Sequence, residues 1–107
     1  MTRPDLDRCR HHARVFKALG HATRLFLVQE LGRGERCVCE LTEMVGADVS
    51  TVSKHLALLR TAGVVQDDKR GTQVFYRLRC DCALNFFSCV NEVLRTVARQ
   101  QAEVVGA

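Results

Sequence analysis

Apolar residues recur every three or four positions along most of the chain, and this spacing predicts α-helices. The predicted helical segments span residues 5–19, 21–31, 38–45, 49–63 and 82–105. Gly20, Gly32 and Gly46 follow the first three segments, at the place where a glycine commonly ends a helix. In the fourth segment, "VSTVSKHLALLRTAG", the inward face starts at Val49 and continues through Val52, Leu56 and Leu59.

The third and fourth segments are short and are separated by the turn "GAD". Two short helices around a glycine-containing turn form the helix-turn-helix pattern. After residue 63 the period changes to two, and residues 64–67 and 73–78 predict two strands joined by a polar tip with Gly71. We therefore predict a mainly α fold with a small β-hairpin, in the order α-α-α-α-β-β-α, which is the winged helix-turn-helix.

The size of the chain and the apolar face of its last predicted helix bear on its assembly. With 107 residues, the chain buries one modest core, so a single domain over residues 1–107 is expected. Phe86 widens the apolar face of the last helix beyond what a monomer of this size covers, which predicts a homodimer. No stretch approaches the roughly 18 apolar residues of a membrane span, and no secretory signal opens the chain, so a cytoplasmic location is expected.

Positive charge is concentrated in one part of the chain. The net charge is +4, and residues 50–79 hold six basic residues against two acidic ones, while ten of each kind balance elsewhere. Such a local excess is typical of a surface that binds nucleic acid. A solvated basic face without a partner is the alternative.

In a helix-turn-helix the second helix enters the major groove of DNA. The candidate DNA-binding residues on that helix are Ser50, Thr51, Ser53, Lys54 and His55. Two of them have an alternative role, since Ser50 can cap the helix and His55 can be an ordinary surface residue. Flanking phosphates or the minor groove would be reached by Arg60 and by the hairpin tip residues Lys69, Arg70, Thr72 and Gln73.

Four motifs, in this order, cover about residues 15–79: "FKALGHATRLFLVQEL", "CVCEL", "VSTVSKHLALLRTAGVV" and "KRGTQVFYRL". Together they resemble the ArsR/SmtB family of metal-responsive transcriptional repressors. The resemblance implies a homodimer paired through the first and last helices that binds double-stranded operator DNA. It also implies release by an inducer, commonly arsenite, antimonite, cadmium, lead or zinc, with no organic cofactor.

Six cysteines in a reducing compartment favour metal binding or redox chemistry over a disulfide framework. Cys37 and Cys39 are the main candidate ligands, because thiolates select soft, thiophilic ions. With Cys37 as N-cap, Glu40 completes the spacing of a capping box. On a regular helix the two cysteines would point about 200° apart. Both can therefore bind one ion readily only if this first turn is distorted or extended, and we expect capture of the ion to strain or re-aim the helix and so to oppose DNA binding.

A third ligand is expected from outside this pair. Relatives with an all-local site carry a third cysteine where this chain has Thr42. Zinc-sensing relatives place an Asp-x-His pair where this chain has Cys80 and Cys82. The remaining candidates are Cys9, Cys80 and Cys82, with His11 and His12 as weaker ones and Cys89 expected mainly to pack in the core.

Two other functions remain open on the sequence. A redox or persulfide sensor of the same fold would bond Cys37 or Cys39 to one of Cys80, Cys82 or Cys89. A thiol enzyme is a remote alternative, because the chain has no Cys-x-x-Cys, glycine-rich phosphate loop or His-Glu-x-x-His motif.

Overall fold

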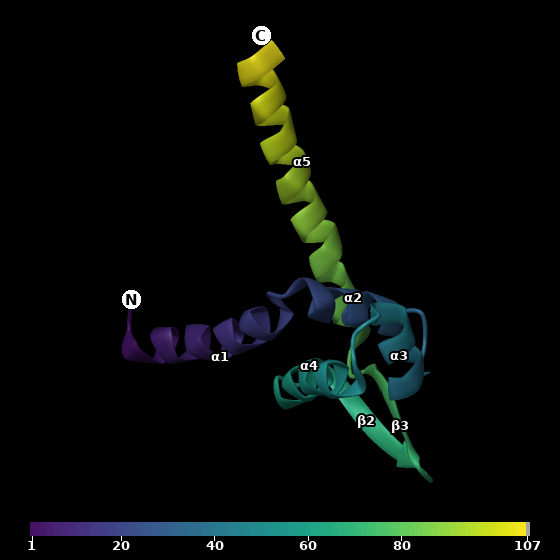
Figure 1. Cartoon of the computed structure of the whole chain (residues 1–107). Helices are drawn as coiled ribbons and strands as arrows, with labels where there is room; N and C mark the ends of the chain where they lie inside the picture. Colours follow the sequence, from purple (N-terminus) through teal and green to yellow (C-terminus); the bar gives the residue numbers. More distant parts are fainter. Residues whose placement is uncertain (107) are drawn as a thin grey trace.

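The computed structural model describes residues 1–106 of the chain, with side chains through residue 104. Its elements, in chain order, are α1 (Arg3–Leu19), α2 (Ala22–Leu31), β1 (Arg36–Cys37), α3 (Val38–Val45), α4 (Val49–Thr61), β2 (Val65–Arg70), β3 (Gln73–Leu78), the 3-10 helix η1 (Asp81–Leu84) and α5 (Asn85–Gly106). The predicted mainly α fold with a winged hairpin is confirmed (Figure 1), and β1 and η1 are additions to it.

The core lies where α2, α3, α4 and the start of β2 meet. Leu27, Leu41, Leu56 and Val65, one from each of these elements, are almost wholly shielded from solvent. The three helical residues of this set are buried as the predicted helical period requires. Val49, the first residue of α4, is predicted to face inward but is 58% exposed. The helix-turn-helix is thus held by its own apolar faces and by one strand of the hairpin.

The turn between α3 and α4 depends on backbone conformation and on one carboxylate. Gly46 adopts a left-handed conformation with φ of 76°, which side-chain-bearing residues rarely tolerate. Asp48 is the N-cap of α4 and accepts a hydrogen bond of 2.9 Å from the Thr51 backbone N–H. The suggestion that Ser50 caps the helix is therefore wrong, and the Ser50 hydroxyl instead donates to the Asp48 carboxylate.

The sheet joins the hairpin to the segment that enters α3. Its strand order is β1-β3-β2, and both pairings are antiparallel. In the short β1 strand, Arg36 lies opposite Tyr76 and Cys37 opposite Phe75. A strand of two residues is too short to show a hydrophobic period in the sequence. β1 is recognised as a strand only from its pairing with β3. The start of α3 is therefore physically linked to the wing, the hairpin β2–β3.

Helix α5 projects away from the rest of the molecule (Figure 1). It begins at Asn85 rather than at residue 82, because η1 takes up the preceding turn. The radius of gyration is 17.0 Å, against roughly 13 Å expected for a compact chain of this length. None of the helices among the described residues combines the length and the apolar character needed to cross a membrane.

Candidate functional site

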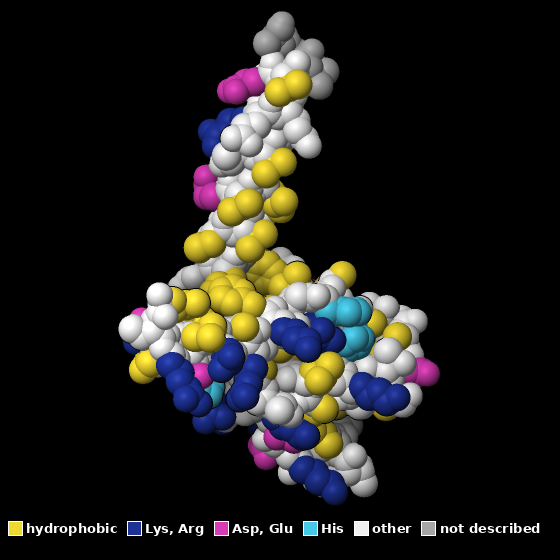
Figure 2. All heavy atoms as spheres, turned by 90° about the vertical axis from the view of Figure 1, so that its left-hand side faces the viewer, with side chains coloured by type: hydrophobic (Ala, Val, Ile, Leu, Met, Phe, Trp, Pro, Cys, Tyr) yellow, Lys and Arg dark blue, Asp and Glu magenta, His cyan; other side chains and the backbone are white. Residues whose placement is uncertain are grey.

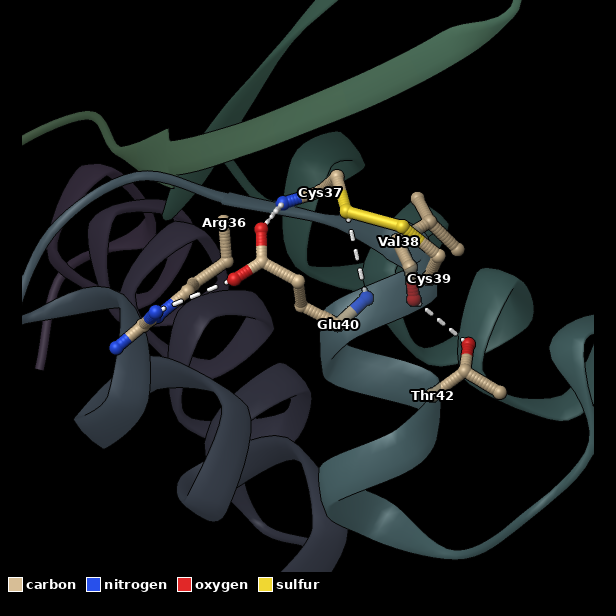
Figure 3. Close-up of a disulfide and its surroundings, with 6 residues drawn as sticks. All are labelled: Arg36, Cys37, Val38, Cys39, Glu40 and Thr42. Carbon is tan, nitrogen blue, oxygen red and sulfur yellow. Dashed lines mark hydrogen bonds and ion pairs between the residues drawn. A yellow bond between two sulfur atoms is a disulfide. The ribbon is translucent and has the colours of Figure 1, made fainter.

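Cys37 and Glu40 form the predicted capping box at the start of α3. Cys37 is the N-cap, and its Sγ accepts a hydrogen bond of 3.4 Å from the Glu40 backbone N–H. The Glu40 carboxylate in return accepts from the Cys37 N–H at 3.2 Å and from the Arg36 guanidinium at 3.2 Å (Figure 3). These contacts hold the first thiol of the pair at the beginning of the helix-turn-helix.

The sulfur atoms of Cys37 and Cys39 lie together and are joined as a disulfide (Figure 3). Cys37 has an extended backbone with ψ of 158°, so it stands outside the helix that contains Cys39. The expectation that the two cysteines can share a partner only if this turn is distorted or extended is therefore confirmed in its extended form. Cys37 is only 4% exposed, whereas Cys39 lies at the surface.

Among the described residues, one chain brings two sulfur atoms to this place and no third ligand. Thr42, which stands where a third cysteine would complete a local site, donates its hydroxyl to the Val38 carbonyl at 2.7 Å. Within residues 1–104, no cluster of three or more His, Cys, Asp or Glu side chains is placed to hold a metal ion. The candidates Cys9, His11 and His12 are exposed on α1.

Cys80 and Cys82 form a second pair, which also begins at the N-cap of a helix. Cys80 is the N-cap of η1, and its Sγ accepts from the Cys82 backbone N–H at 3.4 Å. Hydrogen bonding from the Cys82 thiol lowers the pKa of Cys80, and the same contact raises the pKa of Cys82. Both thiols are free and exposed, so this pair is chemically accessible.

The remaining cysteine positions differ from two expectations. Cys89 is exposed on α5 in this chain, so the prediction that it packs in the core is wrong. The redox pairing considered from the sequence is not the one formed: Cys37 bonds Cys39, while Cys80, Cys82 and Cys89 stay free.

The candidate DNA-binding residues of α4 divide into exposed and enclosed positions. Ser50, Thr51 and Lys54 are exposed on the free side of the helix. Ser53 is half-buried and lines a cleft of about 340 Å³ with Thr72 and Gln73 of the wing. The same cleft is lined by Cys37 and Cys39, so the thiol pair borders both elements expected to touch DNA.

His55 lies against α2 rather than on the exposed face of α4. Its Nδ1 is 3.1 Å from a guanidinium nitrogen of Arg24, and its ring packs against that of His21 with centroids 4.5 Å apart. Partial burial lowers the pKa of His55, and the nearby His21 and Arg24 lower it further. Arg24 also donates to the Ala18 carbonyl at 2.5 Å, so it links the end of α1 to α4.

Two of the cations expected on phosphates are paired with acidic side chains. Arg60 contacts Asp67 at 2.8 Å, and Arg70 contacts Glu35 at 2.7 Å and Asp68 at 3.0 Å. The contact between Arg70 and Glu35 ties the tip of the wing to the segment just before Cys37. The contacts of Arg70 with Glu35 and of Arg24 with His55 each join residues more than 30 positions apart. No motif of neighbouring residues in the sequence could therefore have predicted them.

Comparison with known proteins identifies the family. A model described as "Bacterial regulatory protein, arsR family" matches residues 21–67, which contain α2, α3 and α4. The "Biofilm growth-associated repressor" of Xylella fastidiosa is 40% identical over 79 residues, covering 73% of this chain and 69% of that protein. The chain belongs to the ArsR family.

Other members of the ArsR family agree in fold and in kind of function. The "Arsenical resistance operon repressor" of Escherichia coli is 45% identical over 65 residues, which cover 60% of this chain and 56% of that protein. A homodimeric winged helix-turn-helix DNA-binding domain from Mycobacterium bovis, described as a possible ArsR-family regulator, superposes with a TM-score of 0.78. The Mycobacterium bovis domain is 27% identical in sequence, and the match covers 94% of this chain and 93% of the Mycobacterium bovis chain. The chain is therefore a transcriptional regulator of this family.

Proposed function

We propose that this ArsR-family regulator is a homodimeric repressor that releases DNA when a thiophilic metal or metalloid ion binds Cys37 and Cys39. Arsenite or antimonite is the first candidate inducer, followed by cadmium or lead. The proposal rests on one observation: the two sulfur atoms converge at the N-terminus of α3, beside a cleft that α4 and the wing also line.

DNA binding is supported by the free side of α4 and by its neighbours. Ser50, Thr51 and Lys54 present two hydroxyls and an ammonium group near the N-terminus of that helix, where a recognition helix meets base edges and phosphates. Lys69 at the wing has no acidic partner among the described residues, so its charge is available to a phosphate. The Mycobacterium bovis relative is itself named a DNA-binding domain.

Dimer formation is supported by the apolar face of α5 and by one residue of α1. Val93 and Leu94 are each 60% exposed, as is Phe16, whose ring lies 5.6 Å from that of Phe86. Hydrophobic side chains run along α5 and gather where it meets the body of the molecule (Figure 2). A second copy that covers these faces would remove them from water, and the Mycobacterium bovis domain is homodimeric.

The chemistry of the thiol pair fits a soft ion once the disulfide is reduced. Two thiolates from Cys37 and Cys39 are soft ligands on one side of α3, and soft ligands prefer thiophilic ions to magnesium or calcium. A further ligand has to come from elsewhere, with Cys9 of a second copy or the pair Cys80 and Cys82 as the candidates. The Escherichia coli relative is named for arsenical resistance.

The position of Cys37 provides a route from the ion to DNA. Cys37 caps α3 through its sulfur and pairs with Phe75 of the wing through its backbone. An ion that draws Cys37 toward new ligands would shift both elements at once. A coupling free energy of about 1 to 3 kcal/mol, typical of allosteric linkage, weakens DNA binding by about 5- to 150-fold.

The test uses serine variants, which remove the thiol and keep a side chain of similar size. At Cys37, which is the N-cap, serine also keeps the capping box. We expect the reduced wild-type protein to bind a duplex selected from a random DNA library and to release it on addition of arsenite. Cys37→Ser and Cys39→Ser should bind DNA but no longer respond, while Cys89→Ser should respond as wild type does. An unchanged arsenite response in both of the first two variants would contradict the proposed sensor site.

A second candidate function, a thiol redox sensor, is favoured by the disulfide between Cys37 and Cys39. In this case peroxide or polysulfide would oxidise the pair and dithiothreitol would restore it. Release of DNA by polysulfide in a metal-free buffer, reversed by dithiothreitol and lost in Cys39→Ser, supports redox sensing. Release by arsenite alone supports the metalloid sensor.

A further inference from the structure

We infer that a second phosphate-binding surface lies beside the recognition helix α4, on the side away from the wing. It is a groove between α1 and α4 whose cationic side chains are Arg14, Lys17 and Arg24, and we call it the flank groove. Its proposed occupant is the sugar-phosphate backbone of one DNA strand. This inference rests on the proposed DNA-binding function and adds a contact surface to it.

The direction of each side chain around α4 places the flank groove opposite the wing. At about 100° per residue, Lys54 and Thr61 lie opposite the buried face that carries Val52 and Leu56. Thr61 lines the flank groove, with Leu58 and Ala62 on the same side of the helix.

The other edge of the exposed face of α4 belongs to the wing. Ser53 lines the cleft that includes Thr72 and Gln73, and Arg60 contacts Asp67 of β2. The exposed face of α4 is therefore bordered by the wing along one edge and by the flank groove along the other.

The flank groove is basic, and its cations are less neutralised than those of the wing. It has a volume of about 480 Å³, and no acidic side chain lines it within the described part of the chain. Arg14 and Lys17 form no ion pair among the described residues, whereas Arg60 and Arg70 on the wing side are both paired with carboxylates. Lys and Arg side chains gather on the body below α5 in the view that faces α1 (Figure 2).

The dimensions of DNA explain why both edges of α4 matter. The major groove is about 12 Å wide, close to the 10 to 12 Å diameter of a helix with its side chains, and a phosphate backbone bounds it on either side. If α4 fills this groove, the wing edge faces one backbone and the opposite edge faces the other. Unpaired cations on that opposite edge are complementary to the second backbone.

This arrangement also changes the charge distribution deduced from the sequence. The excess positive charge of residues 50–79 includes two arginines that are neutralised by neighbours. Cationic side chains of α1 and α2, which lie outside that segment of the sequence, are brought to α4 by folding. The cationic surface around the recognition helix therefore draws on three helices rather than on one segment.

The test measures how DNA affinity depends on salt, using the full chain and the duplex selected by the wild-type protein. Each lost phosphate contact reduces the slope of log K against log salt concentration by about 0.9. The double variant R14Q/K17Q removes two contacts from each protomer of a dimer. We expect it to bind more weakly, with a slope smaller by about 2 to 4, and to release DNA on inducer addition as wild type does.

The matched control is R95Q/R99Q, which removes the same charge from α5. Arg95 and Arg99 lie on the side of α5 away from Val93 and Val97, and Arg95 pairs with Glu92. We expect the control to keep the wild-type slope of log K against log salt concentration. Thermal melts should show that both double variants are folded, because all four replaced side chains are exposed. Should R14Q/K17Q melt early, K17Q alone replaces it, with an expected slope reduction of about 1 to 2.

Ethylation interference supplies an independent readout. In each half-site, wild type should show interfering phosphates on both strands that border the major groove, and R14Q/K17Q should lose those on one of the two strands, which is the opposite strand in the other half-site. Equal slopes and equal interference in the variant and the control would overturn the flank groove as a DNA contact. If the wild-type protein itself selects no DNA, the proposed repressor function fails, and with it the premise of this inference.

Discussion

Replacing Arg24 with methionine should destabilise the protein, because Arg24 joins the end of α1 to α4. Its guanidinium donates to the Ala18 carbonyl at 2.5 Å and lies 3.1 Å from Nδ1 of His55. A hydrogen bond from a charged donor contributes about 1.5 to 3 kcal/mol, and partial exposure favours the lower end. Methionine keeps most of the side-chain volume, so we expect a loss of about 2 to 4 kcal/mol in the free energy of unfolding.

The assay is urea unfolding at one protomer concentration, because the stability of a dimer depends on concentration. A double-mutant cycle with His55→Leu isolates the contact between α2 and α4, for which we expect a coupling of about 1 kcal/mol. Arg14→Met is the matched control, since it removes the same group from an exposed site on α1 and should cost about 0.5 kcal/mol or less. If the effects of Arg24→Met and His55→Leu add within about 0.3 kcal/mol, the link from α2 to the recognition helix does not exist.

Three further predictions concern pH, the missing ligand and the turn. Because the pKa of His55 is lowered in the folded state, the unfolded state binds more protons, so stability should fall as pH drops through the ordinary histidine range. The contribution is at most about 1.4 kcal/mol per pH unit, measured by urea unfolding between about pH 5 and 8, and His55→Leu should flatten it. Thr42→Cys should raise arsenite affinity by about tenfold or more, because it adds a third local thiolate. Competition with a fluorescent dithiol ligand measures this affinity, and an unchanged value would mean that the new thiol does not reach the ion. Gly46→Ala should lower the free energy of unfolding by about 1 to 2 kcal/mol, because a left-handed φ is unfavourable for alanine. A Cβ at this position meets no atom within 4 Å, so backbone strain is the only expected cause, and an unchanged free energy of unfolding in urea would reject it.

The capping box shows what local sequence can predict about the candidate site. Cys37 and Glu40 are three residues apart, and their reciprocal hydrogen bonds depend only on the chain starting a helix there. The sequence allowed Cys37 and Cys39 to converge only on a distorted or extended first turn, and the structure has the extended form, because an N-cap residue has an extended backbone. The cap assignment contained this information, since it already placed Cys37 outside the helix.

By itself, the sequence determined the order of the helices, the helix-turn-helix, the wing and the family, because these follow from periodicity, caps and motifs over a few neighbouring residues. Only the tertiary structure decided which distant groups meet. It paired β1 with β3, joined Arg24 to His55 and Arg70 to Glu35, and exposed Cys89. It also brought Arg14 and Lys17 beside α4. Such contacts depend on how whole elements pack, and a pattern read over a few neighbouring positions carries no record of that packing.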